Sequence, residues 1–255
     1  MADNNSFKSH FIELRSRLLN SLIFIFVIFI ISYVFAEHLY NFLVEPYSKA
    51  VRDEGGQRRL IFTALHETFI TYIKVAFFSA IFIGSPVLLI QIYKFIAPGL
   101  YKNEKQALLP YLISTPILFL LGGLLVYYLV MPLAIKFFLS FETLGSNTTL
   151  PIQLEAKVNE YLSLIMRLIF AFGISFQLPI LLNLLARIGV VNSNYLKTRR
   201  RYVIVIIFAI AAILTPPDPI TQVGLAIPLL LLYELSIFTV KFTEKNKEKE
   251  SLEDA

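Results

Sequence analysis

The sequence contains no cysteine, no tryptophan and only three histidines among its 255 residues. The absence of cysteine excludes disulfide bonds, thiolate metal sites and thiol catalysis. The histidines His10, His38 and His66 lack the spacing of metal ligands, and no HExxH, GxSxG or phosphate-binding glycine motif occurs. The sequence therefore predicts no catalytic residue, no bound metal and no cofactor, and it argues against an enzyme.

The sequence also has few charged residues. Only 16% of the residues are charged and 56% are hydrophobic, which gives a mean hydropathy of +0.68. A soluble domain of this length with so little charge would aggregate. Several apolar runs reach roughly 20 residues, the length that crosses a hydrocarbon core of about 30 Å. We therefore expect an all-α integral membrane protein with six transmembrane helices.

The six apolar segments are separated by polar ones. They cover residues 19–36, 68–93, 107–131, 161–188, 202–214 and 220–240. We expect a long polar loop with a turn at Pro46 after the first span, an end to the third span at Pro132, and a basic loop at residues 189–201.

The fifth and sixth spans are predicted to be short. About 13 residues at about 1.5 Å each give the fifth span a length of roughly 20 Å, less than the hydrocarbon core requires. The rigid segment at residues 215–219 (TPPDP) joins it closely to the sixth span. This hairpin would either thin the bilayer locally or lie tilted beneath neighbouring helices, and the sequence favours neither arrangement.

The chain divides into three regions. Residues 1–18 are predicted to form a cytoplasmic amphipathic helix, residues 19–240 the six-helix transmembrane domain, and residues 241–255 a charged cytoplasmic tail without fixed structure. With the N-terminus inside, fifteen Lys and Arg residues fall on the cytoplasmic side and six outside, which predicts that both termini are cytoplasmic. The net charge of +5 is thus explained by topology, without nucleic-acid binding.

Polar residues in an apolar chain need a physical reason. Glu13 could form an ordinary helical ion pair with Arg17, or Glu13 and Glu104 could together bind an incoming guanidinium through bidentate hydrogen bonds. Gln177 and Gln222 lie within predicted spans. Their side chains could hold the helices together or bind another membrane helix, and both alternatives remain open.

Four short motifs and one proline follow one another along the chain. They are residues 10–17 (HFIELRSR), Pro46, residues 95–101 (FIAPGLY) followed by Glu104, residues 172–176 (FGISF) and residues 214–218 (LTPPD). Together they resemble the TatC family, the core component of the twin-arginine protein translocase. The resemblance covers about residues 7–240. It implies a non-enzymatic receptor in the inner membrane of a bacterium, which binds Arg-Arg signal peptides of folded proteins at the cytoplasmic face.

The resemblance also implies partners and site residues. With the single-span proteins TatA and TatB, and with self-association in the membrane lipid, such a receptor moves its cargo by the proton-motive force. The implied signal-peptide site consists of Glu13, Arg17, Phe95, Lys102 and Glu104. Docking of a partner helix is implied at Thr215, Gln222 and Gln177, and a role in transport at Pro46 and Asp218.

Gln177 is a departure, because family members often carry a glutamate there. An amide can form hydrogen bonds but cannot carry charge or exchange a proton. A small-solute transporter is the alternative function, and it would need polar groups on broken helices at mid-membrane. Gln177, with Pro179 nearby, is the candidate for that arrangement.

Overall fold

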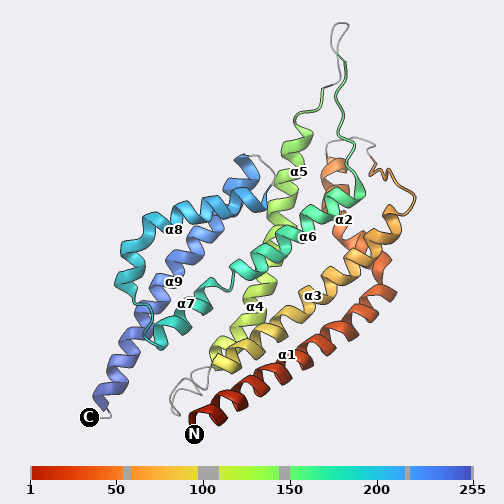
Figure 1. The fold of residues 1–255 in the computed structure, drawn as a ribbon. Helices are drawn as coiled ribbons and strands as arrows, with labels where there is room; N and C mark the ends of the chain where they lie inside the picture. Colours follow the sequence, from red (N-terminus) through yellow and green to blue (C-terminus); the bar gives the residue numbers. More distant parts are fainter. Residues whose placement is uncertain (1, 54–58, 97–108, 144–149, 216–218, 254–255) are drawn as a thin grey trace. The chain divides into compact units, whose positions relative to one another are not determined.

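The computed structural model describes residues 2–53, 59–96, 109–143, 150–215 and 219–253 (Figure 1). This part of the chain is helical apart from short extended segments, which confirms the all-α prediction. Its elements in chain order are α1 (Ala2–Val34), α2 (Ala36–Asp53), α3 (Glu67–Ile96), α4 (Leu109–Leu125), the π-helical turn η3 (Val126–Val130), α5 (Met131–Leu139), α6 (Val158–Ser175), α7 (Leu178–Arg187), α8 (Ser193–Leu214) and α9 (Pro219–Glu253).

The chain forms two compact units. The first contains Met1–Leu43 and Phe62–Ile117, and the second contains Val44–Ile61 and Leu118–Ala255. In the first unit, α1 and α3 lie side by side and antiparallel (Figure 1). Helix α1 passes residue 18 without a break, so the N-terminal segment and the first apolar run form one helix.

Small residues allow α1 and α3 to approach closely. A Cβ atom at Gly84 of α3 would overlap the side chain of Ile25 of α1, so glycine is needed there. One helical turn further along α1, the rings of Phe29 and Phe77 lie 6.3 Å apart. Close packing of this kind, rather than expulsion of water, holds helices together in lipid.

The predicted polar loop after the first span is wrong, because α2 occupies its first half. Pro46 lies inside this helix rather than in a turn. Leu43, Tyr47, Ala50 and Val51 are buried, at the spacing of one helical face. The helix forms because burial of this apolar face outweighs the loss of one hydrogen bond at the proline.

Pro132 does not end the third span, which stays helical to Leu139. The proline lies in the first turn of α5, directly after η3. A proline removes one N–H donor from a continuous helix, and the π-helical turn before it, in which the Met131 N–H donates to Val126 O, absorbs the local change in register. The helix therefore continues where the sequence predicted its end.

The predicted fourth span is two helices. Helix α6 ends at Ser175, and α7 begins at Leu178 with Pro179 in its first turn. The predicted basic loop at residues 189–201 is largely absent, since α8 begins at Ser193 and its first turns contain the basic residues. These residues extend the fifth apolar segment into a 22-residue helix.

Helix α9 continues through the charged tail, which was predicted to lack fixed structure, as far as Glu253. The tail is rich in lysine and glutamate, which have high helix propensity, and it continues directly from a stable apolar helix. Helix formation therefore needs no new nucleus there.

Within the residues that the structure describes, five segments are long and apolar enough to cross a membrane. They are Arg15–Val34, Glu67–Tyr93, Leu109–Leu139, Val158–Arg187 and Thr221–Lys245. The predicted fifth span, residues 202–214, lies in α8 but is preceded directly by basic residues, so its apolar part is short.

Candidate functional site

The predicted signal-peptide residues that the structure describes lie in the first unit, on α1 and α3. Phe29 of α1 is level with Phe77, and Ile25 is level with Gly84. Continued along both helices, this antiparallel register places Glu13 level with the last turn of α3, which contains Phe95. The two helix ends lie together at one end of the pair (Figure 1).

Arg17 is one helical turn beyond Glu13 along α1 and is partly buried, as is Phe95. Lys102 and Glu104 lie outside the described residues. The structure thus brings together the backbone positions of Glu13, Arg17 and Phe95 at one end of the first unit. The segment after Phe95 leads in sequence directly to Lys102 and Glu104.

Gln177 lies at the break between α6 and α7 in the second unit, and only 5% of it is exposed. Its backbone N–H donates to Ile174 O at 2.9 Å, and its carbonyl accepts from Leu181 N at 2.9 Å, so it forms the corner between the helices. Sequence analysis treated residues 161–188 as one continuous span, and it named Gln177 with Pro179 as the candidate for a broken helix only in the transporter alternative. Pro179 is the local signal for the break, because a proline interrupts a helix that precedes it.

Asn183 of α7 forms a polar network that sequence analysis missed. Its Nδ2 donates to Pro179 O at 2.7 Å and to Thr239 Oγ1 of α9 at 2.6 Å. Thr243 Oγ1 donates to Asn183 Oδ1 at 3.1 Å. A lone asparagine in an apolar run was the available signal, since such an amide needs a partner on another helix.

Two of the three predicted docking residues, Thr215 and Gln222, lie where α8 ends and α9 begins. Thr215 is 6% exposed, and its hydroxyl donates to Ala211 O at 2.9 Å. Gln222 Nε2 of α9 donates to Phe208 O of α8 at 3.4 Å. Ile213, which was not predicted, is 78% exposed at this end of α8. Asp218 lies outside the described residues.

Pro46 is buried in α2 beside a polar contact that the sequence did not predict. Tyr127 Oη of η3 donates to Glu45 Oε2 at 3.1 Å, and Lys49 Nζ lies 2.7 Å from Glu45 Oε1. The hydrogen bonds from Lys49 and then Tyr127 lower the pKa of the Glu45 carboxyl, and the same pairing with Glu45 raises the pKa of Lys49. Glu45 thus links α2 to the π-helical turn.

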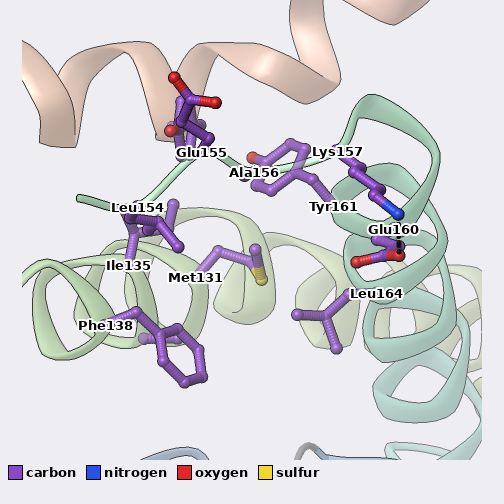
Figure 2. A pocket seen from close by; sticks show the side chains of 12 residues that line it. Met131, Ile135, Phe138, Leu154, Glu155, Ala156, Lys157, Glu160, Tyr161 and Leu164 are labelled. Atoms are coloured by element: carbon purple, nitrogen blue, oxygen red, sulfur yellow. Dashed lines mark ion pairs between the residues drawn. The ribbon is translucent and has the colours of Figure 1, made fainter. Parts of the chain in front are cut away.

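A cavity of about 300 Å³ lies between α5 and α6 in the second unit (Figure 2). Met131, Phe138 and Leu164 give it an apolar lining. At its rim Lys157 Nζ lies 3.7 Å from Glu160 Oε1. Backbone hydrogen bonds of 3.1 and 2.9 Å between Ile61 and residues 156–158 hold this rim in place. The lining suits an apolar group.

Metal binding has no support in the described part of the chain, where no three His, Asp or Glu side chains are grouped to hold an ion. The chemistry available here is hydrogen bonding, ion pairing and apolar packing.

Comparison with known proteins identifies one family. The model of the family described as "Sec-independent protein translocase protein (TatC)" matches residues 9–228. A TatC protein of Magnetococcus marinus is 50% identical over 247 residues, which are 96% of this chain and 88% of that protein. The TatC protein of Escherichia coli K12 is 36% identical over 94% of this chain and 90% of its own.

Solved structures agree in fold. A crystal structure of the "Twin Arginine Translocase Receptor- TatC" superposes with a TM-score of 0.77 at 39% identity, covering 92% of this chain and 99% of that one. A second, obtained in DDM, gives a TM-score of 0.78 at 40% identity over 91% of this chain.

Proposed function

The chain belongs to the TatC family of Sec-independent translocase proteins, and from this we propose that it is the core receptor subunit of a twin-arginine translocase. It is a multi-pass membrane protein of protein transport. In the proposed function it binds Arg-Arg signal peptides of folded proteins at the cytoplasmic face. Together with TatA and TatB, it then moves them across the bacterial inner membrane, driven by the proton-motive force.

The observation that carries this proposal is the common end of α1 and α3. The register of the pair places Glu13 level with Phe95, and the chain continues from Phe95 to Glu104. In the proposed site, the carboxylates of Glu13 and Glu104 each accept two parallel hydrogen bonds from one arginine of the peptide. Lysine cannot make that bidentate contact, which would explain selection for an arginine pair.

The partner-helix site is proposed at the α8–α9 turn. Gln222 is partly exposed there, and Ile213 offers an apolar surface to a single-span helix. The Thr215 hydroxyl is already bonded within α8, so its contribution would be to shape the turn. Gln177, buried at the α6–α7 corner, would accept hydrogen bonds but could not carry a proton for coupling.

Photocrosslinking of a model signal peptide to membranes that contain the full chain tests the receptor function. We expect the Arg-Arg peptide to be labelled and its Lys-Lys version to be labelled weakly. Glu13→Ala or Glu104→Ala should each reduce labelling roughly tenfold, since a hydrogen bond to a charged group contributes about 1.5–3 kcal/mol. Glu155→Ala, which removes an exposed glutamate of the second unit, is the matched control and should label normally. Unchanged labelling of both site variants would refute the assignment.

A small-solute transporter is the second candidate, favoured by the broken helix at Gln177. The transporter function would be supported if adding a small solute raised the melting temperature of the purified protein. A protein that binds the signal peptide and is stabilised by no solute would exclude it.

A further inference from the structure

Three consecutive arginines in the first turns of α8 have different surroundings. Arg200 forms an ion pair with Glu234 of α9, with Nη2 2.6 Å from Oε2. Arg199 lies over the rings of Tyr195 and Tyr202, at 5.4 and 5.7 Å from their centroids. Arg201 lies 4.8 Å from the centroid of the Tyr202 ring, and its Nη2 donates to the Tyr202 hydroxyl at 2.9 Å.

The local charge is therefore unbalanced. Among the described side chains, the one carboxylate paired with this arginine run is Glu234, and it is used by Arg200. The guanidiniums of Arg199 and Arg201 both lie near the Tyr202 ring, so their positive charges repel each other and a bound anion would lower this electrostatic energy. Stacking on tyrosine holds a guanidinium flat and leaves N–H groups along its edge, the geometry that binds phosphate oxygens.

An apolar surface continues from these arginines along α8. Tyr195, Arg199, Tyr202 and Ile206 recur at helical spacing and share one face. Arg201 and Val205 lie further round the helix, and the Arg201 guanidinium reaches the same Tyr202 ring. Ile206 is 54% exposed, and the adjacent Val205 is 68% exposed. Along this part of α8 the arginines come first and the apolar residues second, with Tyr202 at the boundary, where aromatic residues gather in membrane proteins.

We propose that this face binds an anionic phospholipid. Its lipid phosphate lies against Arg199 and Arg201, and an acyl chain follows Val205 and Ile206. A soluble anion would satisfy the two guanidiniums but leave the apolar part uncovered, whereas a phospholipid matches both parts. The proposed lipid site is at the opposite end of α8 from Thr215. The proposal does not depend on the signal-peptide receptor function.

Lipid titration of the purified full-length protein in detergent tests the proposal, with the rise in melting temperature as the measurement. Phosphatidylglycerol should stabilise the protein at lower concentration than phosphatidylcholine. The double variant Arg199→Gln with Arg201→Gln should need roughly tenfold more phosphatidylglycerol for the same rise, as expected when charged hydrogen bonds of about 1.5–3 kcal/mol are lost.

The matched control is Lys241→Gln with Lys245→Gln, which removes the same charge from exposed positions of α9. Glu244 of α9 accepts from the Ser193 backbone N–H at 2.8 Å, so these lysines lie near the start of α8. The control should need less than about twice the wild-type lipid concentration, within the scatter expected for surface charges. Equal losses in both double variants would mean unspecific attraction and would overturn the proposal.

Two further arms separate the remaining outcomes. Glycerol phosphate carries the anion without acyl chains, and stabilisation by it at the same concentration as the lipid would overturn the proposal in favour of a small-anion site. Replacement of both arginines by lysine keeps the charge and loses the planar contact, so it should restore binding in part. Full restoration would show that charge alone is sufficient and would also overturn the proposed geometry.

Discussion

At the scale of single residues, Glu45 shows how one carboxylate connects two elements. It accepts from Tyr127 of η3 and pairs with Lys49 one turn along α2. Because these contacts lower the pKa of Glu45, folding favours its ionised form. The resulting stabilisation is present above the ordinary carboxyl pKa of 4.5 and disappears as the pH falls through the lower value of the folded state.

We therefore predict that Glu45→Gln lowers the melting temperature at pH 7, and that the difference from wild type shrinks as the solution is acidified below about pH 4. Thermal melts of the two proteins across this range provide the measurement. Glu155→Gln serves as control, since Glu155 is exposed. A difference that stays constant with pH would show that the Glu45 charge is irrelevant to stability.

Sequence analysis located several of these residues but rarely their partners. It placed Gln177 within a span and flagged Pro46, and both are buried. It did not find Tyr127 for Glu45, because the two are 82 residues apart and no periodicity links them. A hydrogen bond across such a separation follows from the packing of helices, which the local pattern does not encode.

At the scale of elements, close helix contact depends on Gly122 of α4. A Cβ atom there would lie 2.7 Å from the backbone carbonyl oxygen of Phe172 in α6, and backbone cannot move aside as a side chain can. We predict that Gly122→Ala destabilises the protein by about 1–3 kcal/mol, the usual cost of overpacking. Denaturant or thermal unfolding in detergent measures this loss.

Gly224 of α9 is the matched control, because nothing lies within 4 Å of a Cβ atom built there. Gly224→Ala should leave stability unchanged or raise it by up to about 1 kcal/mol, since alanine is the better helix former. Comparable destabilisation by both substitutions would contradict the role of close contact and point to a general effect of glycine replacement.

Helix boundaries were predicted less well than the apolar runs themselves. Each of the five segments long enough to cross a membrane overlaps a predicted span, because length and apolarity are local properties. Several of the errors lie at prolines: Pro46 and Pro132 are inside helices, while Pro179 marks a break within the predicted fourth span. The others lie in charged segments that proved helical, at the start of α8 and the end of α9. A proline disfavours a hydrogen bond, but packing around it decides whether the helix continues.

At the scale of the whole molecule, the family could be identified from the sequence because each motif is a short run of neighbouring residues. The proposed signal-peptide site, by contrast, combines residues that are far apart in the sequence. Residues 10–17 and 95–101 each carry part of it. Glu13 and Phe95, one residue from each motif, come near each other through the antiparallel register of α1 and α3, which contacts such as Ile25 with Gly84 define. Lys102 and Glu104 lie outside the described residues, so their part in the site stays a prediction.

The number of membrane crossings depends on α8, whose apolar part is short. We predict that α8 crosses, giving six spans with both termini inside, because this arrangement places its basic first turns on the cytoplasmic side.

The chain has no cysteine, so each introduced cysteine is its only thiol. With a membrane-impermeant maleimide, Asn194→Cys should be labelled only in inverted vesicles, and Pro219→Cys only in intact cells with a permeable outer envelope. Thr143→Cys, in the segment after α5, should behave like Pro219→Cys. Labelling of Asn194→Cys and Pro219→Cys from the same side would show that α8 does not cross, and the short helix would then have to lie along the membrane surface.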